Sequence, residues 1–127
     1  MSNSTIQQLA KSLAPHDGSY RAWVTCAQGK SASFKIVPAT GSGTPIRTIP
    51  YLQTITTEFY PDSGQLCLIC HGTAMVIFIE GRGLEELADL IAEKRVREIH
   101  VYDPAKYPAS PDNQQPVITS ITVEQSS

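Results

Sequence analysis

Two neighbouring segments near the middle of the chain, 65–71 and 74–80, have apolar side chains at almost every position. Each segment is short, rich in β-branched or aromatic residues and bounded by turn residues, which predicts two strands of an antiparallel meander over 54–80. A strand exposed to water on one side alternates apolar and polar residues, and these two do not. Both of their faces must therefore be covered, because leaving several such side chains wet would forfeit several kcal/mol.

The rest of the chain predicts an α+β fold. Further strands are expected over 20–26, 33–37, 98–102 and 117–123, which gives a mainly antiparallel sheet of about six or seven strands. Apolar residues at helical spacing predict one long helix over 84–95 and a short N-terminal helix over 4–14, both packed on that sheet. The segment 98–102 follows the long helix closely enough to form a parallel crossover with the strand 74–80.

The length of 127 residues predicts a single domain spanning 1–127. Two stretches rich in proline and in small or polar residues, 38–50 and 103–116, are expected to be exposed loops. The first of them includes a short extended piece at 46–49.

The charge and the absence of long apolar runs exclude some partners. Ten basic and twelve acidic residues give a net charge of −2, which disfavours a nucleic-acid binder. The one basic cluster, Lys94, Arg95 and Arg97, is expected in the last turn of the helix, where cations complement the helix dipole. No run approaches the ~20 apolar residues that cross a membrane. We expect a cytoplasmic protein whose three cysteines are free thiols.

The motif Cys67-Leu-Ile-Cys70-His71 matches the C-x-x-C-H pattern of covalent haem attachment. In a strand, however, residues three positions apart point to opposite faces, so the two thiols cannot converge on one small group without a bulge. The same parity weakens a zinc half-site or a redox dithiol. We therefore expect no cofactor and no metal, and a metal or haem site at Cys67, Cys70 and His71 is retained as a weaker alternative.

No combination of serine, histidine and acidic residues stands out as catalytic, and we expect a non-enzymatic protein. The preferred hypothesis is a module that forms a homo-oligomer, a dimer or larger, or binds a protein partner through the second apolar face of its sheet. The alternative is a small-molecule-binding or catalytic domain in which the sheet curves around a pocket. Its candidate residues are His71, Cys67, Tyr60, Trp23, Phe78 and Phe59.

Overall fold

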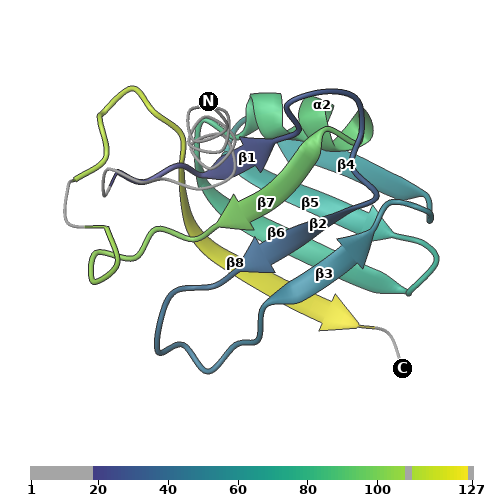
Figure 1. Ribbon diagram of the computed structural model, residues 1–127, viewed down its shortest axis with the longest axis horizontal. Coiled ribbons are helices and arrows are strands. Elements are labelled where there is room, and N and C mark those ends of the chain that lie inside the picture. The colour runs from purple at the N-terminus through teal and green to yellow at the C-terminus, as the bar shows by residue number, and fades with distance from the viewer. Residues whose placement is uncertain (1–18, 108–109, 126–127) are drawn as a thin grey trace, which may run out of the picture.

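The computed structural model describes residues 19–107 and 110–125, which form two four-stranded β-sheets and one short helix (Figure 1). The first sheet has the spatial order β1 (Trp23–Thr25), β7 (Val96–His100), β2 (Ser33–Val37) and β3 (Arg47–Pro50). The second has the order β4 (Ile55–Tyr60), β5 (Gln65–Cys70), β6 (Met75–Arg82) and β8 (Val117–Gln125). The helix α2 (Glu85–Ala92) connects β6 to β7 across the two sheets.

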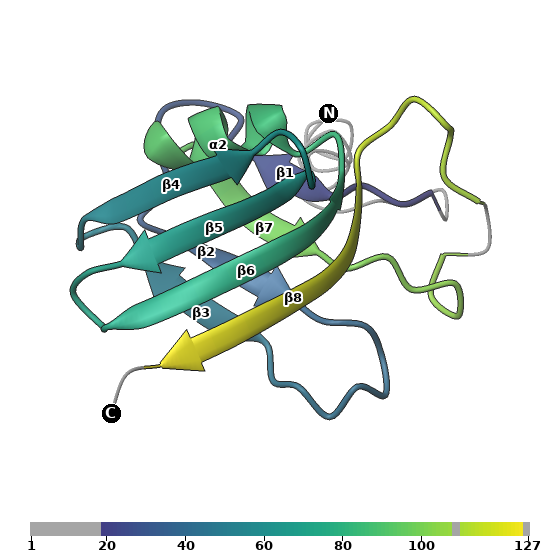
Figure 2. The same ribbon diagram turned by 180° about the vertical axis from the view of Figure 1, so that it is seen from behind.

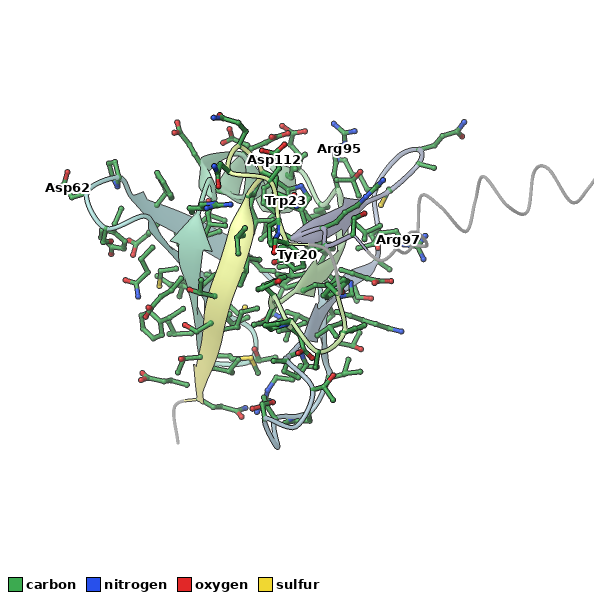
Figure 3. The ribbon with its side chains drawn as sticks, turned by 90° about the vertical axis from the view of Figure 1, so that its left-hand side faces the viewer. Tyr20, Trp23, Asp62, Arg95, Arg97 and Asp112 are labelled. Carbon is green, nitrogen blue, oxygen red and sulfur yellow. The ribbon has the colours of Figure 1, made fainter. Side chains whose placement is uncertain are left out.

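The two sheets face each other as two layers, seen edge-on in Figure 3, and the core lies between them. From the second sheet, alternate residues such as Leu66, Leu68, Ile77 and Ile79 reach this space and have no exposed surface. Phe34 of β2 meets them from the first sheet and is equally buried. Burying each of these side chains contributes roughly 1.5–3 kcal/mol, so this interlayer core accounts for the inward apolar positions of the central strands.

The prediction of one sheet covered by a long helix and an N-terminal helix is wrong. A second sheet, and not a helix, covers the inner face of the meander. The helix has only eight residues and is therefore about 12 Å long, too short to cover a four-stranded sheet, and it lies at one edge of the sandwich (Figure 2). The N-terminal helix expected over 4–14 lies outside the described residues.

The helix ends earlier than its apolar spacing predicts because the chain turns left-handed at Lys94, where φ is 61°. The N–H of Lys94 donates to the carbonyl of Ile91, and the N–H of Arg95 donates to that of Leu90, both at 2.9 Å. These two bonds form a Schellman motif. Lys94, Arg95 and Arg97 therefore follow the helix, and the expectation that they occupy its last turn is wrong.

The meander predicted over 54–80 is confirmed as β4, β5 and β6, paired antiparallel in sequence order. Its first turn follows the expected chemistry, since Gly64 has φ 76° and donates to the carbonyl of Tyr60. The second turn differs from the predicted two-residue loop. Cys70 pairs with Met75, so four residues, 71–74, form the connection, and Ala74 adopts a φ of 53°.

Strand β7 does not join the meander. It lies in the first sheet between β1 and β2, antiparallel to β1 and parallel to β2, so the crossover expected between β6 and β7 is not formed. The ladder with β1 shifts register at Val24, which leaves Arg97 as an extra residue in β7. This bulge turns Arg97 away from the second sheet (Figure 3) while its neighbour Val96 stays buried.

The two long edges of the sandwich are closed differently. At one edge α2 packs against β4 and β7 and buries Leu87, Leu90 and Ile91 (Figures 1 and 2). At the other edge β3 of the first layer crosses β8 of the second layer (Figures 1 and 2), and within the described residues no helix covers the space between them. Strand β3 is formed by the last four residues of the stretch 38–50 that was predicted to be a loop.

Candidate functional site

Four of the residues nominated from the sequence lie on the outer face of the second sheet. Cys67 pairs directly with Phe78 on β6 and with Glu58 on β4. The hydroxyl of Tyr60 donates to Oε1 of Glu58 at 3.0 Å. At the end of the same face, Nε2 of the exposed His71 is 2.9 Å from Oγ1 of Thr56. These residues form a surface, since no described pocket is lined by any of them.

The remaining nominated residues are on the other side of the second sheet or in the first sheet. Trp23 of β1 pairs with Ile99 and packs against the interlayer core, as does Phe59 of β4. The structure therefore separates Trp23 and Phe59 from Cys67 and Phe78 by the thickness of a sheet. The six residues do not converge on one pocket.

The two cysteines of the C-x-x-C-H motif point to opposite faces, as strand alternation predicts. Cys70 pairs with Ile55 and Met75 and faces the core with no exposed surface, whereas Cys67 lies on the outer face. Burial raises the pKa of both thiols, which keeps them protonated and poor ligands. Across the part of the chain that the structure describes, no group of three or more histidine, cysteine or acidic residues is placed to hold a metal ion.

A buried polar cluster lies where the chain leaves β7. Nε2 of His100 is 2.8 Å from Oε1 of Glu98, and Nδ1 of His100 is 3.5 Å from the hydroxyl of Tyr107. Tyr20 donates from its hydroxyl to the carbonyl of His100 at 2.5 Å and accepts the N–H of Ile118 at 3.0 Å. The rings of Tyr20 and Tyr107 meet edge to face at 5.2 Å.

Glu98, His100 and Tyr107 form an acid–histidine–hydroxyl series like those of catalytic relays, but here the series has a structural role. Burial raises the pKa of Tyr107 and, outweighing the opposing effect of Glu98, lowers the pKa of His100. A nucleophilic hydroxyl needs access to substrate as well as an activating base, and Tyr107 is only 4% exposed. The cluster therefore fastens the segments 19–22 and 100–107 onto the end of β8.

The most enclosed of the described hollows lies at the open edge of the sandwich. It is a groove of about 310 Å³ between β2 and β3 on one side and β8 on the other. Five of its eight lining residues are apolar, and Thr44, Thr122 and Arg47 are polar. The apolar lining residues are Ile36, Pro38, Pro45, Ile121 and Val123.

Arg47 is placed in this groove by the β2–β3 ladder. It pairs with Ile36, so its side chain shares the inward face with that isoleucine. Its Nε has no accessible surface and no hydrogen-bond partner among the described residues. A buried donor without an acceptor is rare in folded proteins, and each one calls for an explanation.

Arg82 provides a comparison, because its guanidinium has hydrogen-bond acceptors within the protein. It lines a larger and more open hollow of about 580 Å³ beside the β6–β8 ladder. Its Nη2 donates to the carbonyl of Asp112 at 2.7 Å and its Nε to that of Gln115 at 3.2 Å. Those bonds hold the segment 112–115 in place, so the Arg82 guanidinium is already engaged. The Nε of Arg47 has no such acceptor within residues 19–107 and 110–125.

One wall of the groove is held by a buried carboxylate. Asp103 accepts the N–H of Thr40 at 2.8 Å and the N–H of Ala105 at 3.1 Å. These bonds, the one from Thr40 foremost, lower the pKa of Asp103. The carboxylate thereby ties the start of the loop that carries Thr44 and Pro45 to the segment after β7.

Arg47 was missed from the sequence, where it stands in a stretch taken as loop. A signal was present, because Arg47 occupies an alternate position with Ile49 in the extended piece at 46–49. Its significance depends on Ile121 and Val123, which come from the other end of the chain.

No protein-family model, no curated protein and no solved structure matches this chain. Within the described residues, no helix is long and apolar enough to span a membrane.

Proposed function

We propose that the protein is a non-enzymatic binding domain that takes a small amphipathic carboxylate into the groove at the open edge of the sandwich. The observation that carries this proposal is the buried Nε of Arg47, which has no acceptor among the described residues. A ligand carboxylate would supply that acceptor once the Arg47 side chain shifts to bring its Nε into the groove.

The shape of the groove supports a ligand with an apolar body. Its volume of about 310 Å³ is at the lower end of the range for small-molecule sites. Ile36 comes from one sheet and Ile121 and Val123 from the other, so an alkyl chain inserted between the layers touches apolar carbon on both sides. Ile121 and Val123 are only partly buried in the protein alone, so a ligand in the groove removes more of their apolar surface from water.

The polar residues support a carboxylate head. A guanidinium presents its N–H donors in a planar fork that matches a carboxylate, and such charge-assisted bonds are about twice as strong as neutral ones. Thr44 supplies a hydroxyl group nearby, whereas the side chain of Thr122 points to the outer face of the second sheet. Among the described residues that line the groove, none is acidic and able to compete with the ligand.

A simpler account of Arg47 is that an inward charge on an edge strand discourages pairing with other chains. That role requires only the positive charge of Arg47. Ligand binding predicts in addition that the affinity for a carboxylate falls when the guanidinium is removed. The two accounts therefore differ in a binding experiment.

The test is a titration of the protein with octanoate, followed through the backbone amide signals of residues 121–123 in NMR spectra. Octanol, which has the same chain length without the charge, is the matched ligand control. We expect the dissociation constant of octanoate, measured from these signal shifts, to be at least tenfold lower than that of octanol. The reason is that a charged hydrogen-bonded pair contributes about 1.5–3 kcal/mol. Arg47→Met should abolish the difference, and Arg82→Met should leave it unchanged. Equal binding of octanoate to the wild type and Arg47→Met, or no binding, would contradict the proposal.

A second candidate function, docking of a protein on the outer face of the second sheet, is favoured by one observation. Cys67, Ile69, Val76 and Phe78 form a continuous apolar stripe across β5 and β6, and no helix or strand of the described residues lies over it (Figure 2). Polar side chains of β4 and β8 flank the stripe and leave Ile69, Val76 and Phe78 only partly exposed. Phe78→Ser should weaken a complex formed there, and a pull-down unaffected by this substitution would count against it.

A further inference from the structure

The two sheets have four edge strands, and three of them are poorly suited to pairing with another chain. Strand β1 has three residues, and β3 has four and ends in Pro50, which cannot donate a hydrogen bond. Strand β4 carries the charged Glu58 and lies beside α2. Short strands, prolines and charges are the usual means by which proteins keep sheet edges from associating.

Strand β8 lacks these protections. It has nine residues, and the first seven, Val117 to Val123, include neither a charge nor a proline. The beginning of its free edge is already occupied, because the carbonyl of Ile118 accepts the N–H of Tyr102 and the N–H of Ile118 donates to Tyr20. Beyond the register shift near Gly81, residues 120–125 pair regularly with 80–75 of β6. The regular part of this edge is therefore the segment 120–125, of which the first four residues, 120–123, carry no charge and Glu124 follows them.

This segment is complementary to itself when it runs antiparallel about Thr122. We infer that a second copy of the chain pairs there, so that the two second sheets join into one continuous sheet across a two-fold axis. Ile121 of one copy then lies opposite Val123 of the other, Ser120 lies opposite Glu124, and the two Thr122 residues meet at the axis. Pairs of β-branched residues and of threonines are favourable across antiparallel strands.

Two requirements select the register centred on Thr122: paired side chains must lie on the same side of the joined sheet, and like charges must not lie opposite each other. A one-residue slip of one strand against the other would bring the inward residues of one copy against the outward residues of its neighbour. An axis at Glu124 would place two carboxylates directly opposite, which destabilises a strand pair. The pairing about Thr122 avoids both, and a net charge of −2 per chain opposes association only weakly. It also extends the partly buried inner residues Ile121 and Val123 of each copy into a longer apolar row.

A second copy, rather than another protein, is the occupant that this segment fits. The complementarity arises from one sequence meeting itself, which is the requirement of a two-fold interface. The inference rests on the backbone edge of β8 and requires neither a ligand nor Arg47, although Ile121, Thr122 and Val123 also line the groove.

The test measures the mass of the full chain by light scattering after size-exclusion chromatography at micromolar concentrations. We expect a dimer for the wild type. Thr122→Lys places two cations face to face and should raise the dissociation constant roughly tenfold or more. Thr56→Lys is the matched control, because Thr56 is also exposed on the outer face of an edge strand of the same sheet, and it should leave the dimer unchanged.

A second experiment reads the register directly. Thr122→Cys should give a disulfide-linked dimer on mild oxidation, since the two side chains meet at the axis, whereas Thr56→Cys and the wild type should not. Circular dichroism confirms that each variant is folded. A monomeric wild type, a dimer equally weakened by Thr56→Lys, or equal crosslinking of the two cysteine variants would overturn the inference.

Discussion

Replacing Arg47 with methionine should make the protein more stable. Methionine is unbranched and of similar reach, so it preserves the contact of the arginine stem with the apolar walls of the groove. What the substitution removes is the guanidinium, whose Nε is buried without a hydrogen-bond partner among the described residues. Few substitutions of a charged residue are expected to stabilise a fold, which makes this one diagnostic.

The magnitude follows from the state of the guanidinium. A buried donor left unsatisfied costs about 1–3 kcal/mol. Arg47 as a whole is only partly buried, so its outer nitrogens still reach water and the lower part of that range applies. We expect a gain of about 1 kcal/mol in the free energy of unfolding, equivalent to roughly 3–5 °C in Tm for a chain of this size.

The assay is urea unfolding followed by circular dichroism, in parallel with Arg82→Met. Arg82 donates to two backbone carbonyls, so its loss should lower the free energy of unfolding by about 0.5–1.5 kcal/mol. Opposite signs for the two variants are the expected result. If Arg47→Met destabilises the protein as much as Arg82→Met does, the Arg47 guanidinium already has hydrogen-bond partners in the folded protein. A ligand carboxylate is then not needed as its acceptor.

Two further predictions concern the core and the buried cluster. Gly81→Ala should lower the free energy of unfolding by about 3 kcal/mol or more, because the new Cβ would lie 2.0 Å from the carbonyl oxygen of Val117. Gly43→Ala, with open space around it and a φ of 77°, should cost only about 1 kcal/mol by the same urea unfolding measurement, and equal losses in the two variants would contradict this prediction. Burial lowers the pKa of His100 from 6.5, so its contribution is full above that pH and declines as the pH falls through the lower pKa of the folded state. Between about pH 7.5 and pH 5 the wild type should therefore lose more stability than His100→Gln, and parallel curves would show that His100 is not responsible.

The parts of the fold that the sequence predicted are those determined by neighbouring residues. Alternation and turn chemistry are local properties, and they located β4, β5 and β6, the strand 33–37 and the start of β8. The end of α2 was misplaced because its termination depends on a left-handed Lys94, a conformation that lysine rarely adopts.

The assignment of strands to two sheets was not predictable in the same way. The apolar residues on both sides of β5 and β6 indicate that cover is needed, but they do not distinguish a helix from a second sheet. The inner face is covered by strands such as β2 and β7, which are distant in the sequence. The groove has the same origin, since Arg47 gains its significance from Ile121 and Val123 across the interlayer space.

The position of β7 between β1 and β2 also constrains the order in which the chain can fold. Because β1 and β2 make no ladder with each other, the first sheet cannot be assembled until β7 has left the ribosome. The meander β4–β5–β6 has only neighbouring strands to pair and can form earlier. Until β7 arrives, the nascent chain exposes Phe34 and Ile36, and we expect molecular chaperones to bind it during that interval.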